Sequence, residues 1–265
     1  MVRAIIFDYD ETLTTENSIT FLVKRQIRRY FESEKFFNPF KGFLYLVRIF
    51  FYGLRYERHL RTLFSKKNHN KPINFIINKY GKYVSKYYPY ILRGLKSSTK
   101  SELAKSSKLI PLKPKLKEFL LQLKNNNILI GICSMSIEIA VITSLSFVKL
   151  DYVACNNLIY FKKYIGKESV SITTGDSMLN IRDAHDKKNM VLHFSKIHNI
   201  PLNEIIYVGD DFHDFLAADV SGLGLIILNP KKLNRKNIVF YKKGKDHYNF
   251  KIIRNITDVL RYLNT

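Results

Sequence analysis

The 265-residue sequence lacks the features that would place it in several common classes of protein. It has only two cysteines, Cys133 and Cys155, and no CxxC pair, so we expect no disulfide framework and a reducing, cytoplasmic setting. No run of about 18 uncharged apolar residues is present, which argues against a membrane-spanning helix. The opening MVRAIIFDYD reaches acidic residues too early for a signal peptide and has no small-residue cleavage site.

Motifs for two common cofactor classes are also missing. The seven histidines show no zinc-binding spacing such as HExxH. The SGLGL stretch at 221–225 lacks the third glycine of a dinucleotide-binding loop. Cys133, which stands beside Ser134, is interpreted as a small buried residue rather than a nucleophile.

Acidic residues are scarce and unevenly placed. The chain has 44 Lys and Arg against 22 Asp and Glu, which gives a formal net charge of +22. Residues 24–108 hold 21 of the basic residues and only four acids, or +17, which leaves +5 for the rest. Two interpretations remain open: solvated helix faces, or a surface that meets polyanions.

Hydrophobic residues make up 46% of the chain, enough for a packed core. Short apolar runs alternate with patterns of helical period at 115–126 and 189–199, and this alternation predicts an α/β fold: a Rossmann-like parallel sheet flanked by helices. The expected strands are RAIIF at 3–7, NILIGICS at 127–134, LDYVACNN at 150–157, NEIIYVGDD at 203–211 and GLGLIILNP at 222–230.

The stretch from 20 to 108 contains no clear strand pattern. Its apolar residues recur at helical spacing, which predicts an inserted, all-helical cap domain that is basic and rich in aromatics. Residues 1–19 and 109–265 would then form the catalytic core, and Pro111 and Pro114 mark the return of the chain to it. The tail from 255 reads as a short closing helix, with Asn255 or Thr257 as its cap.

The motif FDYDETLT follows directly on the first apolar strand. Asp8 and Asp10 are two residues apart, so both side chains point to the same face. Two neighbouring carboxylates repel each other unless a cation lies between them, and Mg²⁺ prefers oxygen ligands. One carboxylate beside a metal can attack phosphorus, and the other can act as general acid and base.

Two further candidates would bind a phosphoryl group. Ser134 ends the next predicted strand, where its hydroxyl can donate to a phosphate oxygen, although such a serine is often only a turn residue. In the DKKN stretch, Lys187 or Lys188 could neutralise the phosphoryl group, although a single lysine is usually a surface residue in a chain this basic.

A second acidic cluster, YVGDDFHD, follows a later apolar strand. Asp210, Asp211 and Asp214 can complete an oxygen cage for Mg²⁺, and Gly209 lets the backbone turn tightly beside it. Open α/β sheets bind ligands at the carboxyl ends of their strands, where all these candidates lie. Phosphoryl transfer requires mainly positioning and charge neutralisation, which this set of side chains can supply.

The order DxDxT, Ser, Lys, GDxxxD resembles the haloacid dehalogenase superfamily, and more narrowly its phosphoserine-phosphatase-like branch, which carries a helical cap. The resemblance covers nearly the whole chain, although the cap matches only by position and helical character. It implies the following roles: Asp8 as nucleophile and metal ligand, Asp10 as acid/base and as a metal ligand through its backbone carbonyl, Ser134 and Lys187 as phosphate-binding residues, Asp210 as metal ligand, and Asp214 as support for the metal shell or the lysine.

The sequence departs from that branch at three places. An acid nine residues after the nucleophile usually reads the substrate ammonium group, but Asn17 stands there, with Glu16 beside it. Met135 and Ser136 replace a glycine-rich turn, and Asp211 stands where glycine is frequent. These departures argue against phosphoserine itself as the substrate.

The expected function is a Mg²⁺-dependent phosphomonoesterase that forms an aspartyl-phosphate on Asp8, with a small phosphorylated metabolite or a lipid-linked phosphate as substrate. One alternative is a phosphotransferase or mutase with the same chemistry. Another is a protein that binds polyanions through its cap, where residues 36–61 are apolar, aromatic and basic enough to lie peripherally on an anionic membrane. Nucleic acid is a less favoured partner, because no recognised binding motif is present.

Overall fold

The computed structural model describes residues 1–32, 54–55, 58–165, 168–228 and 235–263. A seven-stranded sheet forms the core, in the order β4-β3-β2-β1-β5-β6-β7. Every neighbouring pair is parallel except β3 and β4. The predicted Rossmann-like α/β core is therefore confirmed. The strands are β1 Ala4–Phe7, β2 Leu129–Ile137, β3 Tyr152–Ile165, β4 Glu168–Met178, β5 Ile205–Gly209, β6 Leu223–Ile227 and β7 Phe250–Ile253.

The first strand lies at the centre of the sheet because it can be buried on both faces. Each of its four residues is fully buried. Ala4 and Ile6 contribute to the hydrophobic cluster on one face, and Ile5 and Phe7 to the cluster on the other. Ala4 pairs with Leu129 of β2 on one side and with Ile205 of β5 on the other. An apolar run without alternation is typical of such a strand.

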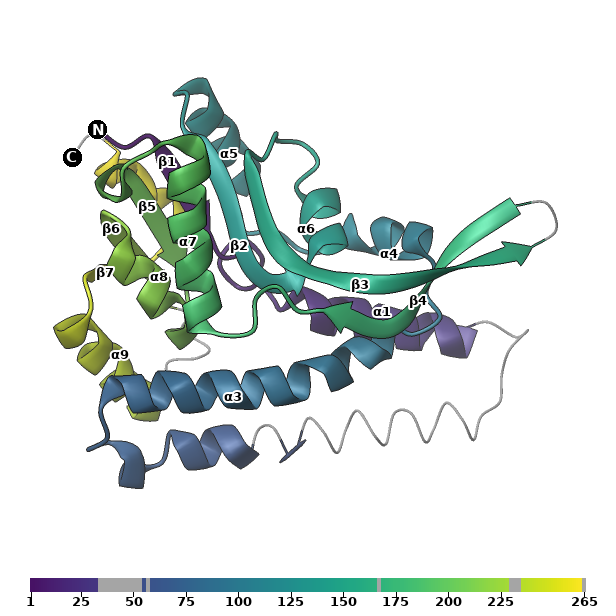
Figure 1. Ribbon diagram of the computed structural model, residues 1–265, viewed down its shortest axis with the longest axis horizontal. Helices are drawn as coiled ribbons and strands as arrows, with labels where there is room; N and C mark the ends of the chain where they lie inside the picture. The colour runs from purple at the N-terminus through teal and green to yellow at the C-terminus, as the bar shows by residue number, and fades with distance from the viewer. Residues whose placement is uncertain (33–53, 56–57, 166–167, 229–234, 264–265) are drawn as a thin grey trace.

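Helices cover both faces of the sheet (Figure 1). On one face lie α5 Leu116–Asn125, α6 Glu138–Ser144 and the 3₁₀ helix η6 Ile256–Tyr262; on the other lie α7 Ala184–His198, α8 Phe215–Val220 and α9 Arg235–His247. The predicted helix at 115–126 matches α5. The one predicted at 189–199 begins earlier, at Ala184, because Asp183 caps it through the amides of His185 and Asp186. Of the two caps considered for the closing helix, Asn255 and Thr257, Asn255 is at the N-cap position of η6.

The described residues of the segment 20–108 are largely helical. They include most of α1 Ser18–Glu32, then η2 Lys66–Asn68, α3 Ile73–Leu92, η3 Arg93–Leu95 and α4 Lys100–Ser107. Figure 1 shows α3 running past the foot of α7, along one edge of the core. Most of the segment 36–61 lies outside the described residues. In the parts of the chain that are described, no helix combines the length and apolarity needed to cross a bilayer.

A long hairpin of β3 and β4 projects from the core (Figure 1). The predicted strand at 150–157 corresponds only to its first part, where β3 pairs with β2 up to Asn156. Beyond that point β3 pairs antiparallel with β4, and Thr99 forms an isolated bridge to Ile172. The sequence ESVSITTGDSM of β4 was not recognised as a strand because it is hydroxyl-rich and has no apolar run.

Candidate active site

Three adjacent strands bring the predicted residues to one edge of the sheet. Because β1 lies between β2 and β5 and is parallel to both, the carboxyl ends of all three meet there. Asp8 follows β1, Asp210 follows β5, and Ser134 lies near the end of β2. The chain segments that supply these side chains are far apart in the sequence, and the sheet topology alone brings them together.

Lys187 joins the first and last motifs. Its side chain is buried on α7, with Nζ 3.0 Å from Asp8 Oδ1 and 2.7 Å from Asp214 Oδ1. Burial alone would lower the pKa of Lys187, but Asp214 and Asp8 raise it above its ordinary value, so the lysine is charged. Lys188 is half-buried next to it. Of the two lysines considered from the sequence, Lys187 is the one that contacts the acids.

Asp214 is held by four donors and holds Lys187 in turn. Its Oδ1 accepts from Lys187 Nζ and, at 2.8 Å, from the hydroxyl of Tyr207. Its Oδ2 accepts from the backbone amides of Asp210 at 3.0 Å and Asp211 at 2.9 Å. With both oxygens used in this way, Asp214 is suited to position the lysine rather than to bind a metal.

Gly209 makes room for the carboxyl group of Asp214, which is not the role predicted for it. The sequence suggested that glycine permits a tight turn, but the backbone of Gly209 is ordinary strand. A Cβ atom at this position would lie 2.2 Å from Asp214 Cγ. Glycine is needed because the carboxyl group of Asp214 packs directly against the strand.

The residues around Asp8 fit a divalent cation. Oxygen atoms of Asp8, Asp210 and Asp214 lie within 4.8 Å of one another, and all three residues are buried. Oδ1 of Asp8 is at ion-pair distance from Lys187 but makes no hydrogen bond of good geometry with the described residues. Burial raises the pKa of Asp8, Lys187 lowers it, and the nearby acids Asp214, Asp210 and Asp10 raise it further. One lysine does not balance this many carboxylates, and a cation bound by Asp8 and Asp210 would.

Asp10 is fixed by the start of the first helix. The amide of Ser18 donates to Asp10 Oδ1 at 2.7 Å, and Asn17 Nδ2 donates to Oδ2 at 3.2 Å. Burial raises the pKa of Asp10 to about 6, and hydrogen bonds from Ser18 partly oppose this rise. Asn17, the residue nine positions after Asp8, thus contacts the candidate acid/base itself.

Ser134 lies where β2 loses its regular pairing with β3, between Cys133 and Ile137. It is buried, and its Oγ accepts from the amide of Ser136 at 3.3 Å. Cys133 is fully buried beside it, and burial raises the pKa of its thiol. This agrees with the interpretation of Cys133 as a packing residue.

A group of tyrosines that the sequence did not predict ties the motif segments to other elements. Tyr80 of α3 donates to Asp211 Oδ2 at 2.7 Å, and Tyr241 of α9 donates to the carbonyl of Asp210 at 2.8 Å. Tyr88 of α3 donates to the carbonyl oxygen of Met135. Tyrosines are numerous in the chain, and no spacing connects these particular ones with the motifs.

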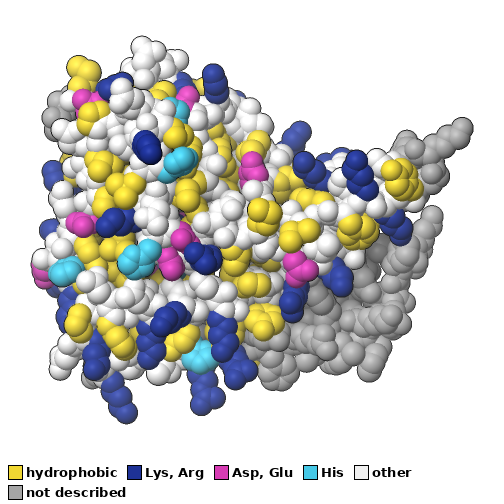
Figure 2. All heavy atoms as spheres, viewed as in Figure 1, with side chains coloured by type: hydrophobic (Ala, Val, Ile, Leu, Met, Phe, Trp, Pro, Cys, Tyr) yellow, Lys and Arg dark blue, Asp and Glu magenta, His cyan; other side chains and the backbone are white. Residues whose placement is uncertain are grey.

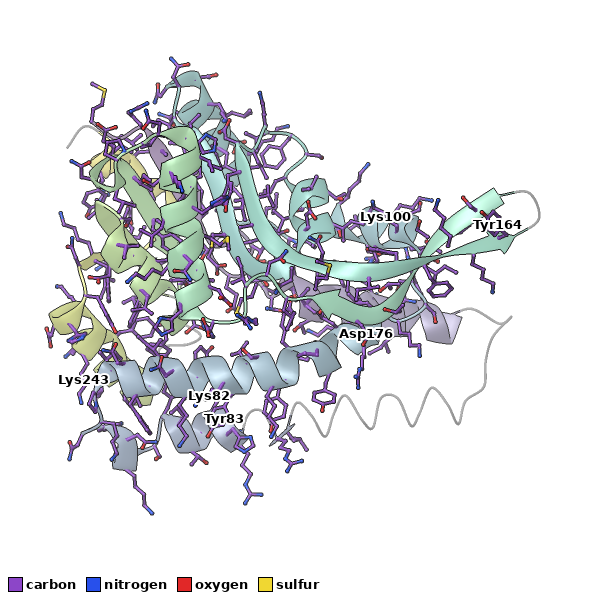
Figure 3. All side chains as sticks on the ribbon, viewed as in Figure 1. Lys82, Tyr83, Lys100, Tyr164, Asp176 and Lys243 are labelled. Carbon is purple, nitrogen blue, oxygen red and sulfur yellow. The ribbon has the colours of Figure 1, made fainter. Side chains whose placement is uncertain are left out.

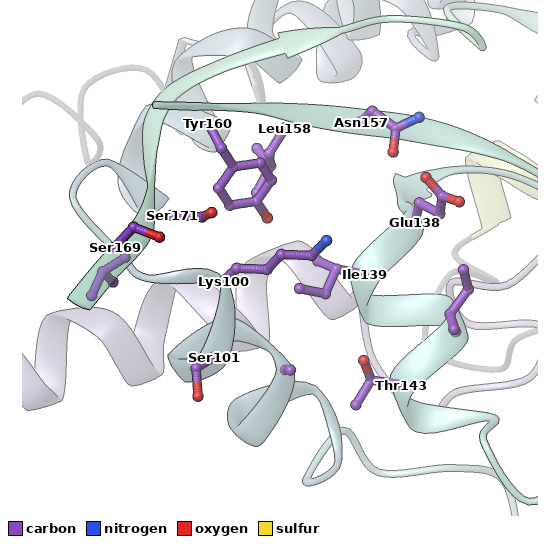
Figure 4. Close-up of a pocket in the computed structure, with 13 residues that line it drawn as sticks. Lys100, Ser101, Glu138, Ile139, Thr143, Asn157, Leu158, Tyr160, Ser169 and Ser171 are labelled. Atoms are coloured by element: carbon purple, nitrogen blue, oxygen red, sulfur yellow. The ribbon is translucent and has the colours of Figure 1, made fainter. Parts of the chain in front are cut away.

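One cavity of the molecule is lined by none of the candidate aspartates. It has a volume of about 660 Å³ and is formed by α4, α6 and the β3–β4 hairpin (Figure 4). Lys100, Glu138 and Tyr160 are among the residues that line it. No predicted catalytic residue lines this cavity, and neither does any residue of the loops that follow β1 and β5, so it is not part of the candidate site.

Neither the models of known protein families nor the sequences of curated proteins match this chain. Solved structures do. A substrate-bound phosphoserine phosphatase has 18% identity and a TM-score of 0.63, with 99% of each chain covered. A phospho-aspartyl intermediate analogue of phosphoserine phosphatase has 19% identity and a TM-score of 0.60, again with 99% of each chain covered. A HAD family hydrolase from Salmonella enterica serovar Typhi has 17% identity and a TM-score of 0.59, over 98% of this chain and 70% of the other. The chain therefore has the haloacid dehalogenase fold in the form found in phosphoserine phosphatase, as the motif order predicted.

Proposed function

We propose that the protein is a Mg²⁺-dependent phosphomonoesterase that works through an aspartyl-phosphate on Asp8. The observation that carries the proposal is the contact of buried Asp8 with Lys187, next to Asp210, at the carboxyl end of β1. The solved structures with the same fold support it, because they include a phosphoserine phosphatase with bound substrate and one with an analogue of a phospho-aspartyl intermediate.

In the first step, a carboxylate oxygen of Asp8 attacks phosphorus, and the bond between phosphorus and the ester oxygen breaks. Asp10 gives a proton to the departing alcohol oxygen, a role for which its hydrogen bonds from Ser18 and Asn17 orient it. In the second step, Asp10 takes a proton from water as the water oxygen attacks the aspartyl-phosphate. Phosphate leaves, and Asp8 is regenerated as a carboxylate.

Charge neutralisation comes from fixed groups. Lys187, held in place by Asp214, faces the charge that develops on the phosphoryl group. Ser134 provides a hydroxyl donor for a phosphate oxygen. Asp8, Asp210 and the backbone carbonyl of Asp10 are the groups that would hold Mg²⁺, which when bound neutralises phosphoryl oxygens.

A panel of phosphate monoesters tests the proposal. We expect release of inorganic phosphate in the presence of Mg²⁺, and no release from any ester by the Asp8→Asn variant. An amide at position 8 is a poor nucleophile and a poor Mg²⁺ ligand. Phosphate release by Asp8→Asn at the wild-type rate would exclude the mechanism. Transfer of the phosphoryl group to an added alcohol in place of water would favour the phosphotransferase alternative.

A second candidate function is adhesion to an anionic membrane surface. Residues 58–100 contain eleven Lys and Arg and no acid. On α3, Lys79, Lys82 and Lys86 recur at helical spacing, and the last two are exposed. Figure 2 shows basic side chains gathered along this edge of the molecule, and Figure 3 shows Lys82 on the side of α3 turned away from the sheet. Such a face would attract anionic lipid headgroups.

A further inference from the structure

A cavity of about 400 Å³ lies between the cap helices and the two catalytic loops. Glu11 and Asn17 of the loop after β1, and Asp211 and Phe212 of the loop after β5, form its floor on the core side. These residues flank the candidate nucleophile, acid/base and metal ligands in the chain. The cavity therefore opens next to the position where a phosphoryl group would bind, and its size is within the range of small-molecule sites, roughly 300–1,000 Å³.

The cap side of this cavity is apolar and aromatic. One face of α3 contributes Tyr80, Val84, Tyr87 and Ile91, which are spaced by four, three and four residues. Phe64 adds a further ring and packs on Phe212 with ring centroids 5.1 Å apart. The described part of this wall carries no charged side chain, and the hydroxyl of Tyr80 is already used by its hydrogen bond to Asp211.

The distribution of charge around the cavity is unexpected for this chain. Among the described residues that line it, none is Lys or Arg, although residues 58–100 contain eleven of them. Its charged lining residues are the acids Glu11 and Asp211. Both oxygens of Asp211 already accept hydrogen bonds, one from Tyr80 and one from the amide of Phe212. Among the described lining residues, an anionic group on the substrate other than the phosphate would meet two acids and no Lys or Arg.

The hydroxyls of Tyr80 and Tyr241 attach the walls to the loop after β5 by donating to Asp211 and to the carbonyl of Asp210. The hydroxyl of Tyr88 attaches them to β2 by donating to the carbonyl of Met135. The ring of Tyr80 also packs on His213, with centroids 4.5 Å apart. The cavity is thus held in a constant position relative to the acids, as a site for part of the substrate requires.

We propose that this cavity binds the leaving group of the substrate, and that this leaving group is an uncharged, apolar alcohol. The inference rests on the proposed phosphatase function and narrows it. Substrates are then monoesters of aliphatic or aromatic alcohols, and esters with a second acidic group near the phosphate are excluded. The apolar wall supplies binding energy through burial, while Asp8, Lys187 and Ser134 act on the phosphate.

A series of linear alkyl phosphates tests the proposal, because their leaving groups differ in length and hardly in basicity. From ethyl to hexyl phosphate, kcat/KM should rise at least about tenfold, since each fully buried methylene contributes about fourfold. Phosphoethanolamine, which has a cationic leaving group, should resemble ethyl phosphate or be worse. A flat series, or a preference for phosphoethanolamine or phosphoserine over hexyl phosphate, would overturn the proposal.

A pair of variants tests whether the dependence of kcat/KM on chain length arises in this cavity. Val84→Lys places a cation in the apolar wall and should reduce the hexyl-to-ethyl ratio of kcat/KM several-fold. Phe75→Lys adds the same charge to the same helix on a residue outside the cavity, and it should leave that ratio unchanged. Equal ratios in wild type, Val84→Lys and Phe75→Lys would contradict the assignment.

Binding to the Asp8→Asn variant separates this inference from the phosphatase proposal, because it requires no turnover. Calorimetry should show tighter binding of hexyl phosphate than of ethyl phosphate. If wild type hydrolyses no ester but this difference is found, the phosphatase proposal fails and the cavity assignment holds. If esters are hydrolysed and neither binding nor kcat/KM depends on chain length, the cavity assignment fails alone.

Discussion

The side chain of Asp214 fixes the position of Lys187, the residue proposed to bind the phosphoryl group. Asp214 accepts four hydrogen bonds. Three of them fix its carboxyl group, and the fourth holds Lys187, the buried cation beside Asp8. A lysine has a long, flexible stem, so its charge is useful in catalysis only where a second group holds it. In this chain that second group is packed against a glycine.

Gly209→Ala should therefore damage the site through Asp214. The added methyl group would lie 2.2 Å from Asp214 Cγ, so the carboxyl group must move and Lys187 with it. We expect kcat to fall by at least about tenfold and Tm to fall by several degrees, since overpacking costs about 1–3 kcal/mol. Gly131→Ala on β2 is the matched control, because its nearest neighbour is a side-chain atom of Ile6 at 3.2 Å. Equal effects of the two variants would contradict this role for Asp214.

Asp10→Asn should slow both halves of the reaction while leaving the nucleophile intact. General acid–base catalysis contributes about 10²–10⁴-fold, and the second step needs a base to activate water. A phosphorylated form of the variant should accumulate and be visible by intact-mass measurement. No accumulation, combined with wild-type turnover, would show that another group is the acid/base.

Phosphoserine should be a poor substrate. Asn17 donates its amide to Asp10 at 3.2 Å, so it faces the catalytic acid and has no carboxylate to offer an ammonium group. Of the described residues that line the cavity beside it, none is a Lys or Arg that could meet the serine carboxylate. We expect kcat/KM for phosphoserine to be at least about tenfold below that for an amine-free alkyl phosphate, the equivalent of about 1.4 kcal/mol. The reverse order would refute this prediction.

At the scale of elements, helix α3 has two contrasting faces. One presents Tyr80, Val84 and Ile91 to the cavity, and the other carries Lys82 and Lys86 to solvent. An amphipathic helix of this kind is stabilised by packing of its apolar face, which leaves its charged face free to acquire a separate role. The charged face is the part of the cap that an anionic surface would meet.

The charge of α3 makes membrane adhesion testable. Lys79, Lys82 and Lys86 each contribute about 1 kcal/mol near an anionic surface, and salt screens the attraction. Replacement of all three lysines by Glu should abolish co-sedimentation with phosphatidylserine vesicles at low salt. Co-sedimentation with neutral vesicles, which we expect to be weak for the wild type, should not change. The control, Lys105, Lys108 and Lys117 to Glu, makes the same change of net charge elsewhere on the surface. An equal loss of vesicle binding in both triple variants would show that net charge, and not the face of α3, is responsible for the binding.

The strands buried at the centre of the sheet could be predicted from their apolar runs, whereas peripheral elements such as β4 and α9 could not. The strands that carry Asp8 and Asp210 are uninterrupted apolar runs that end in acids, and this signal is strong in a single sequence. Strand β4 and helix α9 are polar, because they lie at the periphery and bury less, so their patterns are weak. The hydroxyl of Tyr80 reaches Asp211 across 131 positions, and nothing local in the sequence indicates such a contact.

At the scale of the whole molecule, bound Mg²⁺ should stabilise the fold. A ligand that binds only the folded state at 100 times its dissociation constant adds about 2.7 kcal/mol to the free energy of unfolding. We expect Mg²⁺ to raise the Tm of wild type and chelator to reverse the rise and abolish activity. Asp210→Ala should remove most of the Tm shift, because Asp210 lies beside Asp8 in the acidic cluster. A full shift in that variant would place the metal elsewhere.

The position of β1 between β2 and β5 also has a consequence for how the molecule comes into being. The partners of Ala4 in the sheet, Leu129 and Ile205, both lie far beyond it in the sequence. During synthesis β1, the strand that precedes Asp8, therefore has no partner until well over a hundred further residues have been made. It gains its second partner only after helix α7, which carries Lys187, has emerged. Contacts so distant in the chain form slowly. The proposed chemistry at Asp8 therefore requires β5, and we expect a chain interrupted before Ile205 to be inactive.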